Sequence, residues 1–278
     1  MQLPLVLNSF YRLMAQNTPE IIKPKLRGLY NGVNKIATYG FKNRDIFTAI
    51  DFEINSQCNL KCSYCPTSFD GGRGVNYMPE AIFRKAVDDL SAIKYSGRLS
   101  PHFFGEPLMD KRLPELMAYA HAKLPHAQIV IHTNGILLNY EMYKKLVDSG
   151  VSGFLVTQHT KNFPKSFTSI MKDNPETLNV IKVRNLEGLA LFNRAGTVKP
   201  PIARKMKSCH YVSDEISITY TGEVVCTNDF HVKHSFGNVL NNNLLDIWGS
   251  EWFKQIRKEV RKGKFTLDMC RKCALHEE

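Results

Sequence analysis

Seven cysteines form two sets that together account for every cysteine in this 278-residue chain. The early set has the spacing CxxxCxxC and comprises Cys58, Cys62 and Cys65. The late set comprises Cys209, Cys226, Cys270 and Cys273. Cysteine thiolates hold iron–sulfur clusters, usually four for each 4Fe-4S cluster. Four late cysteines can therefore close one cluster, whereas three early cysteines would leave one iron open to chemistry.

Two zinc sites are the alternative interpretation, with Cys270 and Cys273 as a CxxC pair. Zinc is disfavoured because no histidine lies near the early set and because three residues between its first two cysteines are long for a zinc knuckle. Disulfides are disfavoured further, since the cysteine count is odd and the N-terminus lacks the features of a signal peptide. We therefore expect a reducing compartment, the cytoplasm.

The segment NSQCNLKCSYCP, residues 55–66, resembles the cluster loop of radical S-adenosylmethionine (SAM) enzymes. The resemblance implies that the three early cysteines bind a 4Fe-4S cluster and that SAM occupies the fourth iron. One electron then cleaves SAM to a 5′-deoxyadenosyl radical, which abstracts a hydrogen atom from the substrate. It also implies that Tyr64 lies beside the adenine of SAM.

Two further motifs follow predicted strands in the same order as in that family. Gly105 and Glu106 stand at the end of an apolar run, and they resemble the glycine–glutamate motif that binds the amino group of SAM. A carboxylate can accept strong hydrogen bonds from an ammonium group. Thr133 and Asn134 follow the apolar stretch 128–132 and begin a TNG turn. The resemblance implies that these four residues contact the cofactor.

The order of secondary structure indicates an α/β fold. Strands alternate with helices, which predicts a parallel sheet, and each motif falls at a strand's C-terminal end, where barrel enzymes build their sites. The predicted strands begin near Phe47 and at residues 99–104, 128–132 and 153–157, and the predicted helices are 80–94, 113–123 and 140–148. With the resemblance, this order predicts a partial (β/α)6 TIM-type barrel.

The C-terminal part has a different character. A proline-containing linker near residue 200 precedes a predicted hairpin, 216–226, and a single amphipathic helix, 244–260. Hairpin, helix and late cysteines resemble a twitch or SPASM-like module with one auxiliary 4Fe-4S cluster. We therefore expect a basic N-terminal extension (1–45), a radical SAM barrel (46–200) and an auxiliary-cluster module (201–278).

Within the family, residues 52–273 resemble the dehydrogenases that oxidise an aminocyclitol alcohol. The resemblance implies that Arg194 faces the substrate, that Gln158 contacts SAM and that the auxiliary cluster accepts the second electron. His132 departs from the pattern. It is a candidate proton acceptor or hydrogen-bond donor to a substrate hydroxyl, and its alternative is an ordinary core histidine. We expect a sugar-like, aminocyclitol or nucleotide-linked alcohol as substrate.

Charge adds possible partners without identifying one. The formal net charge is +11 and the pI is about 9.3, which suits an anionic substrate or an acidic reductant such as flavodoxin or ferredoxin. No apolar run is long enough to span a membrane. The basic N-terminus is a candidate for peripheral membrane contact, or it packs as an extra helix.

Three function classes stay open at this level. The leading interpretation is a radical SAM dehydrogenase. The second is a radical SAM epimerase, dehydratase or peptide-modifying enzyme with the same modules. The third is a zinc-stabilised nucleic-acid-binding protein, which is disfavoured because the chain lacks an RNA-stacking motif. We expect no nucleic-acid partner.

Overall fold

The computed structural model describes residues 26, 29–30, 33, 45–69 and 72–277. The chain divides into two compact units, Met1–Thr48 and Ala49–Glu278. The predicted extension, residues 1–45, lies almost entirely outside the described residues, so its membrane contact stays a prediction. The predicted borders at residues 46 and 200 also stay predictions.

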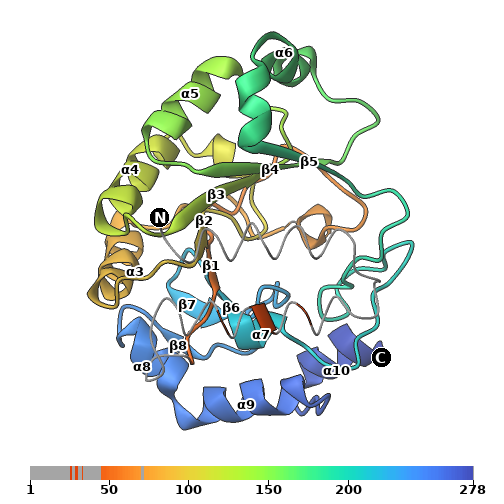
Figure 1. Ribbon diagram of the computed structural model, residues 1–278. Coiled ribbons are helices and arrows are strands. Elements are labelled where there is room, and N and C mark those ends of the chain that lie inside the picture. The colour runs from red at the N-terminus through yellow and green to blue at the C-terminus, as the bar shows by residue number, and fades with distance from the viewer. Residues whose placement is uncertain (1–25, 27–28, 31–32, 34–44, 70–71, 278) are drawn as a thin grey trace. The chain divides into compact units, whose positions relative to one another are not determined.

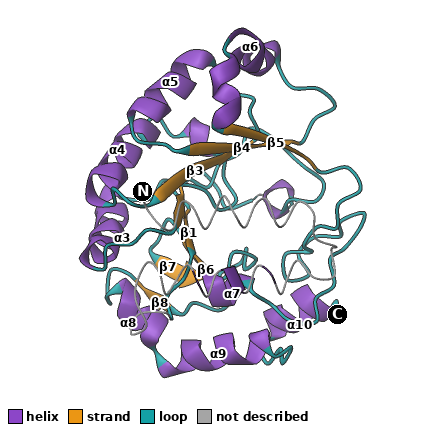
Figure 2. Ribbon diagram, viewed as in Figure 1, coloured by secondary structure: helices purple, strands orange, loops and turns teal. Residues whose placement is uncertain are grey.

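One mixed sheet forms the centre of the second unit (Figures 1 and 2). In the described residues its order is β5-β4-β3-β2-β1-β6-β7-β8. Strands β5 to β6 of this order are parallel, and β7 and β8 are antiparallel. The strands are β1 (Ala49–Phe52), β2 (Arg98–Ser100), β3 (Gln128–Thr133), β4 (Gly153–Gln158), β5 (Ile181–Asn185), β6 (Glu215–Ile218), β7 (Glu223–Val225) and β8 (Gly237–Asn238).

Helices connect the parallel strands and cover the outer face of the sheet, as α3, α4 and α5 do in Figure 1. The helices are α3 (Glu80–Ala92), α4 (Leu113–Lys123), α5 (Tyr140–Asp148), α6 (Lys165–Asp173), α7 (Tyr211–Asp214), α8 (Leu244–Gly249), α9 (Glu251–Arg261) and α10 (Asp268–Leu275). Short 3-10 helices are η1 (Pro66–Ser68), η2 (Pro107–Met109) and η3 (Pro175–Asn179). The predicted α/β class, with a parallel barrel-type sheet and a C-terminal hairpin plus helix, is confirmed.

The predicted helical patterns correspond to buried faces. In α3 the apolar positions at helical spacing, Ile82, Phe83, Ala86, Val87 and Leu90, are all buried. Helix α5 begins where the Asn139 side chain accepts a hydrogen bond from the backbone of Met142. Such a cap satisfies a donor that would otherwise lack a partner in the first turn. The Asn139 cap therefore fixes where α5 begins, and the buried apolar residues of α3 fix which face of that helix packs against the core.

Strand β1 joins the barrel strands to the C-terminal hairpin. All four of its residues are buried, and it pairs in parallel with β2 on one side and with β6 on the other. Strand β6 comes from beyond residue 200, so the cysteine-rich C-terminal part shares one sheet with the barrel strands. This pairing brings the late cysteines to the same unit as the early ones.

Two predicted boundaries were wrong. The single helix predicted over 244–260 is two helices, because Ser250 has extended backbone and caps α9 by accepting a hydrogen bond from Phe253. The strand predicted over 99–104 ends at Ser100. Pro101 follows, and proline has no backbone N–H to continue a ladder. Among the helices that the structure describes, none is long and apolar enough to cross a membrane.

Candidate active site

A cavity of about 180 Å³ opens where the parallel strands end. It is lined by Cys58, Leu60, Cys62, Tyr64, Cys65, His102, Phe103, Phe104, Gly105, Glu106, His132, Thr133, Asn134, Thr157, His159, Arg184 and Arg194. Every residue predicted for the early cluster, for SAM or for the substrate is in this set, with one exception. Gln158 is absent from the lining, and its side-chain amide donates to the carbonyl of Lys161 instead.

The early cysteines share one loop after β1 and face the cavity as free thiols. The backbone N–H of Cys65 donates to the carbonyl of Cys62 across 3.0 Å, which holds the second half of the loop as a tight turn. Burial raises the pKa of Cys58 to about 11, and Glu106 and the other two thiols add to that increase. A cationic metal group would reverse this balance and stabilise the thiolates. The donor set therefore fits an iron–sulfur cluster with one open iron.

The glycine–glutamate motif packs directly against the cysteine loop. A Cβ atom on Gly105 would lie 2.3 Å from the backbone oxygen of Asn55, so only glycine fits there. The Asn55 side-chain amide donates to the carbonyl of Glu106 across 3.0 Å. The backbone N–H of Glu106 donates to the carbonyl of Gln57 across 2.6 Å. The two sequence motifs thus form one interlocked structure.

Glu106 is a buried carboxylate that is held by neutral donors. It accepts hydrogen bonds from the hydroxyl of Thr133 at 2.7 Å and from the backbones of Asn134 at 2.9 Å and Leu108 at 3.1 Å. Burial raises its pKa, and these three hydrogen bonds oppose the increase. No arginine or lysine in the described part of the chain pairs with it. This lack of a neutralising cationic side chain among the described residues leaves the carboxylate able to pair with a cationic ligand group.

Tyr64 has a partner that the sequence did not single out. Its hydroxyl lies 2.7 Å from Nδ1 of His159, and the two rings are stacked with centroids 6.0 Å apart. Burial, followed by the nearby charge of Arg184, lowers the pKa of His159 to about 4. His159 is therefore neutral near pH 7, and together with Tyr64 it forms an aromatic wall that suits a planar base.

His132, in β3, and His102, just after β2, form a second aromatic pair in the cavity lining. Their ring centroids are 4.2 Å apart. Burial lowers the pKa of His102 to about 3, and Arg98, Arg194 and Arg184 add to the decrease. Burial, then His102, Arg98 and Arg184, lowers the pKa of His132 as well. Both imidazoles are therefore neutral near pH 7.

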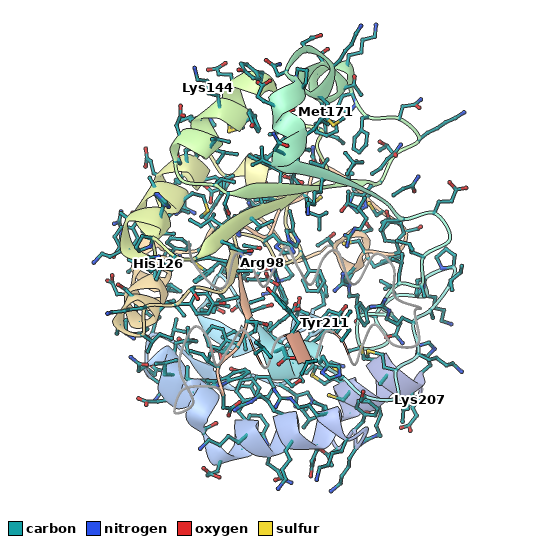
Figure 3. All side chains as sticks on the ribbon, viewed as in Figure 1. Arg98, His126, Lys144, Met171, Lys207 and Tyr211 are labelled. Carbon is teal, nitrogen blue, oxygen red and sulfur yellow. The ribbon has the colours of Figure 1, made fainter. Side chains whose placement is uncertain are left out.

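Arg98, labelled at the centre of Figure 3, connects the His132–His102 pair to buried carboxylates. One of its Nη atoms donates to Asp51 at 3.0 Å and lies 3.3 Å from Nε2 of His132. A second nitrogen forms an ion pair with Glu215 at 3.5 Å. Nδ1 of His102 is buried without a hydrogen bond, 3.8 Å from Asp51. Residues of β1, β2, β3 and β6 thus build one polar network beneath the cavity.

Arg194 lies between the two cysteine sets. It is partly buried, donates to the side chain of Asn228 across 2.7 Å, and its guanidinium lies 5.3 Å from the ring centre of Phe104. Burial lowers its pKa, and the thiols of Cys65, Cys226 and Cys273 oppose that decrease. The charge of Arg194 is therefore near enough to thiols of both sets to influence their ionisation.

The late cysteines are four buried free thiols, each 5–9% exposed. Burial raises the pKa of all four, to about 12 for Cys270 and about 11 for Cys273. The three other late thiols each add to the increase for Cys226, so the four lie close together. No three His, Cys, Asp or Glu side chains in the described residues converge on a single metal ion. The fit to a larger iron–sulfur group rests on four desolvated thiols.

Sequence reasoning missed His102, His159, Thr157 and Arg184. Arg184 donates to the hydroxyl of Thr157 across 3.0 Å at the cavity wall. These residues stand at or just beyond strand ends, and that position was the available signal. The parallel register brings them together from separate segments.

The fold and the open three-cysteine site define a radical SAM enzyme. The chain belongs to the radical SAM superfamily, whose model matches residues 52–180, and residues 209–274 match the SPASM iron–sulfur cluster-binding domain. The predicted class, the two 4Fe-4S clusters and SAM as cofactor are thereby confirmed.

Individual relatives show which radical SAM enzymes this chain is similar to. The SAM-dependent 2-deoxy-scyllo-inosamine dehydrogenase of Niallia circulans is 32% identical over 234 residues, which cover 82% of this chain and 93% of that protein. The crystal structure of BtrN in complex with AdoMet and 2-DOIA has a TM-score of 0.76 at 31% identity and covers 82% of this chain and 93% of that one. An open conformation of BtrN has a TM-score of 0.65 at 29% identity, with coverages of 82% and 92%.

Proposed function

We propose that this radical SAM enzyme oxidises a hydroxyl group of a sugar-like, cyclitol or nucleotide-linked alcohol to a ketone. The observation that carries the proposal is the position of Arg194. It lines the cavity together with Cys65, it donates to Asn228, two residues after Cys226, and its charge influences thiols of both cysteine sets. A substrate held there lies within reach of both cluster sites, as loss of a hydrogen atom followed by loss of an electron requires.

When bound, the open cluster and SAM supply a 5′-deoxyadenosyl radical, and the closed cluster accepts one electron. The chain's own residues bind and orient. Glu106 holds an ammonium group through a carboxylate that lacks any other cationic partner among the described residues. Tyr64 and His159 form the wall for the adenine. Gly105 keeps the glutamate loop against the cysteine loop.

The two neutral histidines support recognition of hydroxyl groups. Arg98 can only donate, so Nε2 of His132 is an acceptor and its proton lies on Nδ1. His132 then donates to a ligand. Nδ1 of His102 is buried 3.8 Å from the Asp51 carboxylate, which favours the proton at Nδ1 and leaves Nε2 as an acceptor. A donor beside an acceptor matches hydroxyl groups, which do both. Arg194 supplies a fixed positive charge for the oxygen that becomes the carbonyl.

A net oxidation is favoured over epimerisation because all seven cysteines belong to the two ligand sets, which leaves no spare thiol as a hydrogen donor. Dehydration and peptide modification use the same modules and are outcomes of the test below. We also propose a reducing, cytoplasmic location, since thiolate ligands must stay reduced. A flavodoxin or ferredoxin as reductant, an anionic substrate and peripheral membrane contact remain predictions.

The test is product analysis with the anaerobically reconstituted enzyme, SAM and dithionite. The first probes are 2-deoxy-scyllo-inosamine and neutral inositols, and mass spectrometry detects 5′-deoxyadenosine and the alcohol product. We expect one ketone for each 5′-deoxyadenosine with the correct alcohol. An isomer of unchanged mass would indicate an epimerase, and loss of water a dehydratase. Either result would overturn the dehydrogenase proposal.

A further inference from the structure

The positive charge of this chain is concentrated around the late cysteines. Residues 199–210 and 257–278 contain eleven basic and four acidic residues, a net +7 of the total +11. The N-terminal residues 1–45 carry another +5, and the remaining residues are close to neutral. The net charge is therefore a local property of the C-terminal part and of the N-terminus, not of the barrel.

The two C-terminal segments lie side by side over the closed cysteine set. The backbone N–H of Cys209 donates to the carbonyl of Val260 across 2.9 Å. The backbone N–H of Met206 donates to the carbonyl of Ala274 across 3.1 Å. Three of the four late cysteines belong to these segments. The segments that carry most of this charge are therefore adjacent to each other and to the late cysteines in space as well as in sequence.

A close backbone approach fixes this surface. Gly263 has a φ of +79°, and a Cβ atom there would lie 2.3 Å from the carbonyl oxygen of Lys207. Only glycine allows the turn after α9 to approach the other segment so closely. Lys207 and Lys262 are consequently held on neighbouring stretches of one surface.

Three lysine side chains in these two segments have no partner among the described residues. Lys205, Lys207 and Lys262 are exposed. In the part of the chain that the structure describes, their side chains have neither an ion pair nor a hydrogen bond. Figure 3 labels Lys207 at the periphery beside α10. The group of Lys205, Lys207 and Lys262 is called the basic face below.

Two neighbouring basic residues form ion pairs within the fold. Arg261 pairs with Asp214 at 3.2 Å, and Lys264 pairs with Glu259 at 3.1 Å. Arg261 and Lys264 therefore stabilise the module through ion pairs, whereas the three lysines of the basic face are available to a partner.

We propose that the basic face docks an acidic one-electron carrier of the flavodoxin type, which removes the electron that substrate oxidation leaves on the auxiliary cluster. The proposal rests on the proposed function. Oxidation of an alcohol to a ketone removes two hydrogens. One leaves as a hydrogen atom to the 5′-deoxyadenosyl radical. The second leaves as a proton to solvent and one electron, and the flavin of the carrier takes that electron.

Position favours an electron carrier over other anionic partners. Electron transfer slows steeply with distance, and the late thiols lie just beneath the segments that bear the basic face. Complementary charge raises association rates and fixes orientation. A carrier docked here brings its flavin to the nearest surface of the closed cluster, whereas a nucleic acid or a lipid surface would gain nothing from that position.

The test compares two triple charge reversals in the reconstituted holoenzyme. The first variant is Lys205→Glu/Lys207→Glu/Lys262→Glu. The matched control is Lys144→Glu/Lys165→Glu/Lys172→Glu on α5 and α6, where the three lysines are also exposed and without ion pairs among the described residues. Binding of oxidised flavodoxin is measured by titration calorimetry at low and at high salt. Iron content and circular dichroism check that each variant is folded.

We expect the first variant to weaken flavodoxin binding at low salt by roughly tenfold or more and to lose most of its salt dependence. The control should weaken binding by less than about threefold. Equal weakening in both variants, or none in the first, would overturn the docking site. Loss of binding to phosphatidylglycerol vesicles in the first variant, with flavodoxin binding intact, would instead assign the face to lipid.

The design separates this inference from the proposed function. Dithionite delivers the electron that SAM cleavage needs, a step that does not use the proposed docking site, so both variants should cleave SAM at the wild-type rate with it. If the wild type forms no ketone with any alcohol but the binding pattern holds, then the proposed function fails and the docking site stands. If ketone forms and the pattern is absent, then only the docking site fails.

Discussion

Nη1 of Arg98, which also contacts Asp51 and Ser100, lies 3.3 Å from Nε2 of His132. Because an arginine has no acceptor, the proton of this neutral imidazole lies on Nδ1. Of the two roles considered for His132, proton acceptor and hydrogen-bond donor, the contact supports the donor. The same arginine binds Asp51 and Glu215, so strands β1, β2, β3 and β6 together fix one tautomer.

Replacement of His132 by phenylalanine keeps the ring and removes the donor. We expect kcat/KM for the alcohol to fall about tenfold to a hundredfold, as loss of a buried hydrogen bond worth roughly 1–3 kcal/mol implies. Cleavage of SAM without substrate should be unchanged. An unchanged kcat/KM would contradict a role in hydroxyl recognition.

Stability should depend on pH through His102. Its pKa is lowered to about 3 in the folded protein, whereas the unfolded value is about 6.5. Between these values the unfolded chain binds more protons, so stability is complete above pH 6.5 and falls as pH decreases toward 3. The contribution lost at pH 5 is up to about 2 kcal/mol.

The check is urea unfolding of the wild type and of His102→Gln at pH 7 and pH 5. The difference in unfolding free energy between the two proteins should shift toward the variant as pH falls. Because buried carboxyl groups such as Glu106 titrate in both proteins, their opposite contribution cancels in the difference. A difference that is independent of pH would mean that His102 is not held neutral.

Much of the site follows from short stretches of sequence. The cysteine spacing and the residues beside it specify ligands locally, and Glu106, Thr133 and Asn134 converge because each directly follows a parallel strand. His102, His159 and Arg184 carry no such local signal. They face the cavity only because the register sets their strands side by side.

The wrong helix over 244–260 has a different cause. The buried apolar face of Leu244, Ile247 and Trp248 would continue at mostly polar residues beyond Ser250, and the buried residues Phe253, Ile256 and Val260 form a face of different phase. The break was therefore readable as a change of helical phase, which the single-helix prediction overlooked. Ser250 followed at once by the acidic Glu251 is a second signal that a new helix starts there.

Gly105 offers a test of the interlock between the two motifs. Gly105→Ala would drive a methyl group to 2.3 Å from the backbone of Asn55, which must displace the glutamate loop. We expect weaker SAM binding by equilibrium dialysis, by about tenfold or more, as loss of an ammonium–carboxylate contact implies. Gly249→Ala is the control, because a Cβ atom there meets nothing within 4 Å. Equal effects of the two substitutions would contradict the interlock.

Arg194 should tune both clusters. Its charge is in electrostatic contact with Cys65, Cys226 and Cys273, and a nearby cation favours the more negative, reduced state of a cluster. Arg194→Met should therefore lower both midpoint potentials, and Arg194→Lys should preserve them better. Redox titration monitored by electron paramagnetic resonance measures both. A shift in one cluster alone would place Arg194 at that cluster and not between the two.

The account assigns SAM cleavage to the early cysteines and acceptance of the second electron to the late cysteines. Removing each set in turn tests this assignment most directly. Iron content, 5′-deoxyadenosine and ketone are measured for the wild type, for Cys58→Ala/Cys62→Ala/Cys65→Ala and for Cys270→Ala/Cys273→Ala. We predict about eight irons in the wild type and about four in each variant. The early-set variant should form neither product, and the late-set variant should still cleave SAM but form no ketone. SAM cleavage without the early set, or ketone formation without the late set, would contradict the account.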